Sequence, residues 1–359
     1  MRLLLVAAAN SVHTRRWATA FAERGHDVQL ITQHAEEAPY PKDLRIHRLP
    51  HWGGLGYLLN RGAAQRVAHE FRPDAINAHY ATGYGTLAPR NATAPLILNV
   101  WGSDVYEFPE TGPLHRWLLR RNLLRADAVV STSKVMAERT RAVCPGLDAI
   151  NVVPFGVDTE RFSTAQRTNG DLVMGTVKTL APKYGIDTLI LAFALLTRME
   201  GMKDARLRVV GGGPARAELE SLVNEQGVRD RVDFIGPVPH ERVPDELRKL
   251  DVYVALSRAE SESFGVAVIE ASACGLPVVV SRVGGLPEVV EEGVTGLVVP
   301  KEDARAAADA IARLLGDERE RRRMGEAGRA RVLREYEWKA CVDRQLAVIE
   351  TAIAKHRKP

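Results

Sequence analysis

Two glutamates, Glu262 and Glu270, stand eight positions apart in the stretch SRAESESFGVAVIEASACGLPVVVS (257–281). The aliphatic run DVYVALS (251–257) predicts a strand just before them, and Gly265 is expected to open a helix that ends near Cys274. Because the first turn of a helix leaves N–H groups free at its positive end, this helix start predicts a binding site for a diphosphate. The residues expected to line it are Ser263, Phe264, Gly265 and Val266.

The two carboxylates have different places in this prediction. Glu270 lies more than a turn into the helix, from where its carboxylate can accept hydrogen bonds from two vicinal hydroxyls, as a ribose requires. Glu262 lies in the loop before the helix, so the two glutamates would bracket the ligand. A pair at this spacing also occurs on solvated helix faces. A glycosidase uses a carboxylate pair too, but a hydrolase has no need of a phosphate cradle.

Short aliphatic runs alternate with longer amphipathic stretches along most of the chain. In the first half, runs such as 26–32 and 95–102 alternate with helical patterns such as 13–25. The alternation stops in the polar segment 159–171, an expected linker, and then restarts. This pattern predicts an α/β protein with two Rossmann-like, doubly wound parallel-sheet domains and a cleft between them. We expect domains over 1–160 and 170–335, followed by a terminal helix over 336–359.

The bulk composition fits a globular protein of two ordinary domains. The 359 residues are 45% hydrophobic and 26% charged, and no apolar run approaches the ~20 residues that span a membrane. The net charge of +4 is mild and comes with no nucleic-acid-binding motif. Three scattered cysteines indicate a reducing compartment, so a cytoplasmic protein is expected, with the N-terminus retained as a first strand.

The spacing of Glu262 and Glu270 around Phe-Gly resembles the signature of glycosyltransferase family 4, the retaining enzymes of GT-B fold. Further similar stretches cover nearly the whole chain: WGSDV, FGVD, GTVKTLAPKYGIDTLILAF, VVGGGPARAELE and VDFIGPV. The resemblance implies an N-terminal acceptor-binding domain and a C-terminal nucleotide-sugar-binding domain. It also implies that the last helix, after Trp338, crosses back to the N-terminal domain.

The resemblance implies roles for particular residues of the C-terminal half. Lys178 and Lys183 hold the places of the arginine and lysine that grip the diphosphate, with Tyr184 added after the second. Glu262 would orient the donor sugar or balance charge. Gly212 is expected near the nucleotide, although GGGP (211–214) is more typical of a strand-to-helix turn. The residues expected to pack against and read the base are Ile235, Gly236 and Val238.

In the N-terminal half, acceptor-side contacts are expected from Asn10, Ser11, His13 and Trp101. Trp101 stands where many relatives have a histidine, so that histidine's role does not carry over. Asp104 follows a predicted buried strand and is either a catalytic residue or a cap of the next helix. His79 ends the strand 73–79 and is either a catalytic or a hydrogen-bonded structural histidine.

The expected function is retaining transfer of a sugar from a nucleotide sugar to a glycan or lipid-linked acceptor, in surface polysaccharide or glycolipid synthesis. A UDP-sugar is the first expectation and GDP-mannose the second. No cofactor or metal is expected, because the chain has no clustered ligand set. The alternatives are a GT-B nucleotide-sugar epimerase and a non-catalytic binding protein. The helix with Arg116 to Arg125 either contacts an anionic membrane, giving peripheral association, or is an ordinary packed helix with a basic outer face.

Overall fold

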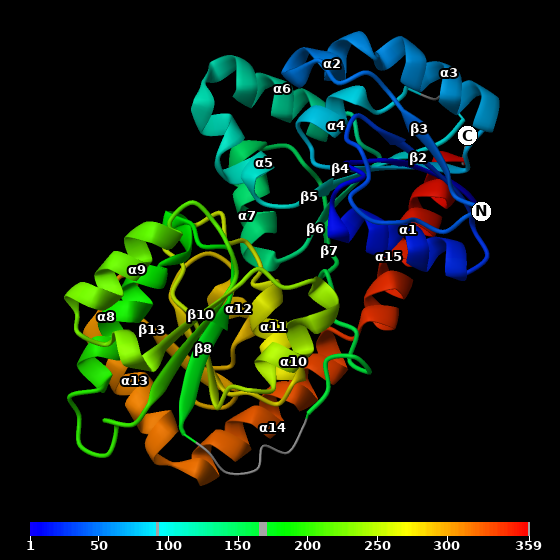
Figure 1. The fold of residues 1–359 in the computed structure, drawn as a ribbon. Coiled ribbons are helices and arrows are strands. Elements are labelled where there is room, and N and C mark those ends of the chain that lie inside the picture. Colours follow the sequence, from blue (N-terminus) through cyan, green and yellow to red (C-terminus); the bar gives the residue numbers. More distant parts are fainter. Residues whose placement is uncertain (91–92, 165–170, 358–359) are drawn as a thin grey trace. The chain divides into compact units, whose positions relative to one another are not determined.

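The computed structural model describes residues 1–90, 93–164 and 171–357. The chain forms two compact units, Met1–Phe155 with Lys339–Pro359, and Gly156–Trp338 (Figure 1). The second unit begins at Gly156 and not near 170, because Val157 pairs with the end of the same unit: its N–H donates to Tyr336 O (2.8 Å) and its carbonyl accepts from Trp338 N (2.9 Å). Most of the expected linker thus belongs to the second unit, and its residues 165–170 lie outside the described part of the chain.

The first unit is built on seven parallel strands in the order β3-β2-β1-β4-β5-β6-β7. The central strands are aliphatic and buried on both faces, as strands covered by helices on both sides must be. Their bounds are β1 (Arg2–Val6), β2 (Asp27–Thr32), β3 (Arg45–Arg48), β4 (Ala75–His79), β5 (Leu96–Val100), β6 (Ala128–Ser131) and β7 (Ile150–Val152).

The second unit repeats this plan with six parallel strands in the order β10-β9-β8-β11-β12-β13. Its core is one cluster of buried aliphatic side chains that includes Met174, Leu207 and Val254. The strands are β8 (Val173–Val177), β9 (Arg206–Val210), β10 (Val232–Gly236), β11 (Val252–Ala255), β12 (Val278–Ser281) and β13 (Gly296–Val299). Both sheets confirm the prediction of two Rossmann-like domains.

Helices cover the two sheets (Figure 1). The first unit contains α1 (Val12–Glu23), α2 (Gly53–Leu59), α3 (Arg61–Phe71), α4 (Gly83–Leu87), α5 (Ser103–Tyr106), η1 (Phe108–Thr111), α6 (Pro113–Leu124) and α7 (Lys134–Val143). The second contains η2 (Pro182–Tyr184), α8 (Ile186–Leu196), α9 (Arg216–Glu225), η3 (Arg229–Arg231), η4 (His240–Arg242), α10 (Val243–Leu247), α11 (Val266–Ala273), α12 (Leu286–Val289), α13 (Ala304–Gly316) and α14 (Glu318–Glu335).

The last helix, α15 (Trp338–His356), packs on the first unit. Gln345 Nε2 donates to Asn99 Oδ1 on β5 (3.3 Å), and Asp343 pairs with Arg24 after α1 (2.8 Å). Ile349 is fully buried. These contacts confirm that the terminal helix returns to the N-terminal domain.

Each sheet has one point where the strand order reverses direction. It lies between β1 and β4 in the first unit and between β8 and β11 in the second. In doubly wound folds, ligands bind beyond the carboxyl ends of the strands at such a switch point. A ligand site is therefore expected in the loops after these four strands.

Candidate active site

In the second unit, the loop after β11 leads into α11 through a glycine that no other residue would replace easily. Gly265 is the N-cap of α11 with φ of 91°, a left-handed conformation that favours glycine, and an added Cβ would lie 2.8 Å from Leu286 Cδ2. Helix α11 therefore starts at Val266, and the N–H groups that begin a helix have no carbonyl one turn earlier to donate to, although Val268 N already donates to Gly265 O (3.0 Å). This is the geometry expected of an anion site.

The loop after β8 brings Lys178 to Glu262, which lies in the loop that leads into α11. Lys178 Nζ donates to Glu262 Oε1 (3.0 Å) and lies 2.9 Å from Oε2. The ring of Tyr184 is close to both lysines, with its centroid 4.4 Å from Lys178 Nζ and 5.2 Å from Lys183 Nζ. The backbone N–H of Arg258 donates to Lys183 O (2.9 Å) and ties the loops after β8 and β11 together.

The environment of Lys178 keeps its side chain charged. Burial by itself would lower the pKa of this amine, but the Glu262 carboxylate and the nearby Tyr253 and Tyr184 hydroxyls outweigh it, so the pKa of Lys178 lies above its ordinary value. The cluster thus presents the Lys178 ammonium group, held by the Glu262 carboxylate, with Lys183 in the same loop and α11 beginning four residues after Glu262. Such a set can stabilise a departing diphosphate.

Glu270 lies on α11, buried to 6% exposure, and is engaged by a residue that the sequence did not single out. Its Oε1 lies 2.9 Å from Nε2 of His240, in the 3-10 turn that follows β10. The end of β10 and the carboxylate expected to hold a ribose are therefore neighbours. Ile235, at that strand end, exposes 37% of its surface, and Val238 is half-buried.

Close backbone packing fixes the loop that carries Glu262. The N–H of Gly285 donates to Glu262 O (2.9 Å), and the N–H of Gly284 donates to Glu260 Oε2 (3.0 Å). A Cβ at Gly284 would overlap Glu262 O, and one at Gly285 would overlap Ser263 O. The absence of side chains at Gly284 and Gly285 therefore lets these two residues pack directly against the backbone of the loop that carries Glu262.

The glycines after β9 likewise pack directly against the backbone of the loop after β8. A Cβ at Gly211 would overlap Lys178 O, and one at Gly213 would overlap Leu180 O. Gly212 accepts from Leu180 N (2.9 Å). These contacts give GGGP the structural role of supporting the lysine loop.

Two of the expected donor-site side chains point into the protein. The ring of Phe264 is 3% exposed and packs edge-on against Tyr336, 5.7 Å between centroids. Ser263 is 6% exposed. The Phe264 ring is therefore a core contact near the start of α11, and the expected donor contact through the backbone N–H of Phe264 stays a prediction.

In the first unit, the expected acceptor-side residues form an aromatic cluster at the ends of β1, β4 and β5. The His13 ring stacks on Phe155 (4.1 Å, 20°) and meets Trp101 edge-on (5.9 Å). Trp101 lies 4.6 Å from His79 and 5.6 Å from Tyr80. Ser11, in contrast, is the N-cap of α1, where Oγ accepts from Thr14 N (3.5 Å), and Asn10 beside it is exposed.

His79 is buried, 2% exposed, and its Nδ1 has no hydrogen-bond partner among the described residues. Burial, with a smaller contribution from His13, lowers the pKa of His79 to about 3. The imidazole is therefore neutral at physiological pH. It is not the hydrogen-bonded structural histidine that was one of the two expectations.

Asp104 does not have the surroundings of a catalytic carboxylate. It is 1% exposed, and its oxygens accept from the backbone N–H groups of Gly102 (2.8 Å), Ala81 (3.0 Å) and Trp101 (3.1 Å). Burial raises the pKa of Asp104 against these hydrogen bonds, which lower it. Asp104 therefore holds the loops after β4 and β5 together, and the catalytic role expected for it is corrected to a structural one. It is not the N-cap of α5 either, since that position is Gly102.

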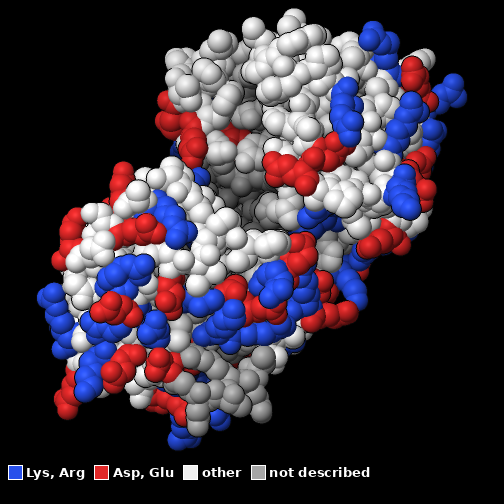
Figure 2. All heavy atoms as spheres, viewed as in Figure 1, with Lys and Arg blue, Asp and Glu red and all other residues white. Residues whose placement is uncertain are grey.

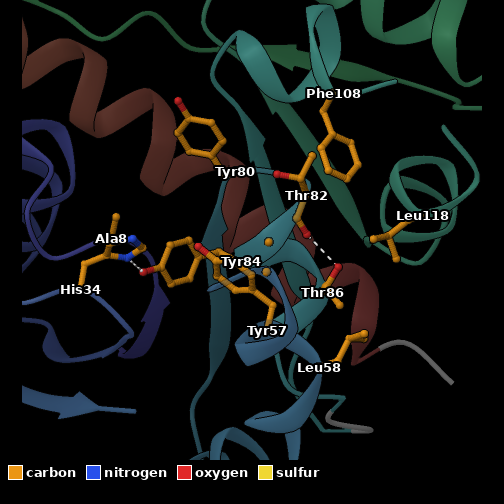
Figure 3. A pocket seen from close by; sticks show the side chains of 12 residues that line it. Ala8, His34, Tyr57, Leu58, Tyr80, Thr82, Tyr84, Thr86, Phe108 and Leu118 are labelled. Carbon is orange, nitrogen blue, oxygen red and sulfur yellow. Dashed lines mark hydrogen bonds between the residues drawn. The ribbon is translucent and has the colours of Figure 1, made fainter. Parts of the chain in front are cut away.

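An apolar cavity of about 350 Å³ opens beside this cluster (Figure 3). Figure 3 shows side chains from α2, α4 and α6 around one hollow, among them Tyr57, Tyr84 and Leu118. Its wall also contains Tyr80, which touches Trp101, and Ala8, just after β1. The cavity thus reaches from the switch point of the first sheet to the surface helices α2 and α6.

Comparison with known proteins assigns the chain to a family. Residues 158–331 match the model of glycosyl transferases group 1, and residues 2–133 match that of a glycosyl transferase 4-like domain. A GDP-mannose-dependent alpha-(1-6)-phosphatidylinositol monomannoside mannosyltransferase from Mycolicibacterium smegmatis is 33% identical over 71% of this chain and 70% of its own. A D-inositol 3-phosphate glycosyltransferase from Xylanimonas cellulosilytica is 30% identical over 98% and 93%.

The chain belongs to glycosyltransferase family 4. It is an enzyme, a glycosyltransferase, and this decides against the epimerase and the non-catalytic binding protein. The GT-B fold is confirmed as well. Sucrose-phosphate synthase from Thermosynechococcus elongatus superposes on the glycosyltransferase with a TM-score of 0.84 at 22% identity, over 99% of this chain and 100% of that one.

Several residues near the expected sites of the glycosyltransferase were not predicted from the sequence. His240 follows a predicted strand, which is where ligand-facing residues lie, so a signal existed. Tyr84 and His34, whose Oη and Nδ1 lie 2.5 Å apart beside the cavity, had no comparable signal because Tyr84 lies on α4 and His34 lies 50 positions earlier, after β2.

Two further findings concern absences within the described residues. They contain no group of three or more His, Cys, Asp and Glu side chains placed to hold a metal ion. Across 1–90, 93–164 and 171–357, no helix of the glycosyltransferase is both long and apolar enough to cross a bilayer.

Proposed function

We propose that this glycosyltransferase moves a sugar, with retention of configuration, from a nucleoside diphosphate sugar to a lipid-linked acceptor. The observation that carries the proposal is the cluster of Lys178, Glu262, Tyr184 and Lys183, formed by the loop after β8 and the loop that leads into α11. The second unit would hold the donor and the first unit the acceptor. The reaction would serve glycolipid or surface polysaccharide synthesis.

Charge stabilisation is the chemistry that the second unit would supply. As the bond to the diphosphate breaks, negative charge grows on the leaving oxygens and the sugar becomes oxocarbenium-like. Lys178, Lys183 and the first-turn N–H groups of α11 would stabilise that charge without reorganising. The oxygen of the acceptor hydroxyl would then bond to the anomeric carbon on the face that the diphosphate leaves, and the departing phosphate would take the proton of that hydroxyl. Glu262 would hold Lys178 in place and orient the donor.

The base and sugar of the donor stay open between two proposals. A UDP-sugar is the first and GDP-mannose the second. The Mycolicibacterium relative is named as GDP-mannose-dependent, whereas the Anabaena protein HepE, which shares the fold at 19% identity (TM-score 0.79, 98% of this chain and 100% of that one), was solved with UDP. Glu270 would bind the ribose hydroxyls common to both, after displacing His240.

The acceptor proposal rests on the cavity in the first unit. A wall of Tyr57, Leu58, Phe108 and Leu118 suits a hydrocarbon or another apolar group better than a free sugar. A lipid-linked acceptor would place its apolar part there, and its sugar would lie near Trp101 and His79. The proposed compartment is the cytoplasm, which fits three buried free cysteines, Cys144, Cys274 and Cys341.

Two substitutions would test the site. Glu270→Ala should weaken nucleotide binding by about tenfold or more, because hydrogen bonds to a charged group contribute about 1.5–3 kcal/mol each. Glu262→Ala should lower kcat by about 100-fold and change nucleotide affinity much less. Thermal-shift titration with UDP, GDP and ADP measures the first effect and a transfer assay the second.

The matched control is Glu326→Ala, an exposed glutamate on α14 outside the cluster. It should behave like the parent in both assays. If Glu262→Ala and Glu270→Ala also keep parental affinity and turnover, the site is elsewhere and the proposal fails.

A further inference from the structure

Exposed apolar side chains are concentrated on one part of the first unit. Eleven large hydrophobic residues are exposed within the described parts of the chain, and seven of these belong to α2, its N-cap or α6. We call them the α2–α6 face: Trp52, Leu55, Leu58, Leu59, Leu114, Trp117 and Leu124. Figure 2 shows the surface over these helices largely free of charged side chains in this view.

The face is continuous and not a scatter of single residues. On α6, Leu114, Trp117 and Leu124 follow one another at helical spacing and expose 71%, 57% and 58% of their surface. Helix α2 is a neighbour of α6, because Leu58 and Leu118 line the same cavity (Figure 3). Contiguous apolar surface of this kind marks a place of contact with another molecule.

Four arginines gather beside this face. Arg61 begins α3 directly after α2, Arg121 and Arg125 lie at the end of α6, and Arg90 follows α4. Arg61, Arg90 and Arg121 form no ion pair with a described residue, and neither α2 nor α6 contains an aspartate or glutamate. The cluster therefore has uncompensated positive charge.

The guanidinium of Arg125 is close enough to the other three arginines to be affected by their charges. Its Nη2 donates to the carbonyls of Gly85 (2.6 Å) and Ala88 (2.9 Å), while its buried Nε and Nη1 have no partner in the described structure. Burial, together with the charges of Arg61, Arg90 and Arg121, lowers the pKa of Arg125 to about 10. The guanidinium stays charged at neutral pH, so an anion placed here would relieve the repulsion.

We propose that the α2–α6 face docks on an anionic lipid bilayer. The leucines and tryptophans would enter the boundary between headgroups and acyl chains, and the arginine cluster would contact lipid phosphates. A packed helix with a basic outer face describes α6 only in part, because Leu114 and Trp117 are exposed on it as well as Arg116 and Arg120. A bilayer is favoured over a protein partner because exposed leucines and tryptophans beside four arginines match an apolar layer covered by phosphates, and neither α2 nor α6 offers a carboxylate.

The experiment is co-sedimentation of the whole chain with vesicles. One set consists of phosphatidylcholine alone and the other of equal parts phosphatidylcholine and phosphatidylglycerol. We expect binding to the anionic set that weakens in high salt. Arg121→Gln should weaken it about fivefold, which is about 1 kcal/mol, and the double variant Leu55→Ser/Leu59→Ser by at least about tenfold.

The matched controls change the same residue types elsewhere. Leu333→Ser and Arg319→Gln, on α14, should bind like the parent. Equal binding to both vesicle sets, parental binding by the face variants, or no binding by the parent would overturn the proposal, as would a dimer held by these residues. Nucleotide thermal shifts in the same samples report folding and the donor site separately, because the inference does not depend on the proposed chemistry.

Discussion

At the scale of single residues, buried polar side chains differ in whether they have hydrogen-bond partners. Asp104 and His79 occupy similar sequence positions, close to the ends of neighbouring strands, yet their surroundings are opposite. Asp104 is satisfied by backbone N–H groups, while His79 Nδ1 has no partner among the described residues. A buried imidazole in that condition is costly to protonate.

His79 should therefore make stability depend on pH. The unfolded imidazole gains a proton below about pH 6.5, and the folded one only near pH 3, so its contribution is present above pH 6.5 and is lost as the pH falls. The free energy of unfolding of the parent should fall by about 1.4 kcal/mol per pH unit relative to His79→Phe over this interval. Urea unfolding of both proteins at several pH values measures the difference, and parallel pH curves would contradict it.

At this scale, predictions from the sequence succeeded where a motif fixes the spacing of functional residues along the chain. The Glu262–Glu270 spacing around Gly265 placed a loop, a helix start and two carboxylates, and the structure has that order of elements. Prediction from the sequence failed for Asp104, because the partners of a carboxylate are backbone groups of a separate loop, at Ala81, that no pattern announces. The His240 contact to Glu270 joins residues 30 positions apart and was missed for the same reason.

At the scale of elements, glycines position the loops of the donor site. Gly285 has an ordinary φ of −85°, so its requirement for glycine comes only from the approach of Ser263 O. Gly293 is the reverse case, with φ of 77° and nothing near an added Cβ. A side chain at Gly285 would be opposed by lack of space, whereas a side chain at Gly293 would be opposed only by the backbone conformation.

Gly285→Ala should push the Glu262 loop away from its position. We expect a loss of about 1–3 kcal/mol in the free energy of unfolding, the usual range for overpacking, and a fall in turnover because Glu262 moves relative to Lys178. Gly293→Ala is the control. It should cost stability through its positive φ but leave turnover unchanged. Equal turnover in the two variants would contradict this role of Gly285.

The elements themselves were largely predictable, apart from three of the four edge strands, since β10 was recognised. Strands such as β5 and β12 are continuous aliphatic runs and were recognised, whereas β3, β7 and β13 were not. These three lie at sheet edges, where one side lacks a neighbour and burial places weaker demands on the sequence. The strand β3 reads Arg-Ile-His-Arg, which carries almost no apolar signal.

At the scale of the whole molecule, α15 makes the first unit depend on the end of the chain. Ile349 is fully buried in that unit. Ile349→Ala should therefore lower the stability of the first unit by about 2–4 kcal/mol through loss of packing and creation of a cavity. The second unit should keep its nucleotide affinity.

Calorimetric unfolding with and without nucleotide measures the two effects. Lys355→Ala, exposed on the same helix, is the matched control and should unfold like the parent. An unchanged unfolding curve for Ile349→Ala would show that α15 adds little to the first unit.

The first unit is built from two separate stretches of the sequence. Because residues 339–359 rejoin the unit formed by 1–155, the second unit is a single uninterrupted stretch, 156–338, inserted within the sequence of the first. A gene fragment for 156–338 would encode that unit whole. The other unit would need a fused coding sequence that splices its two pieces, so that either half could be produced and titrated by itself.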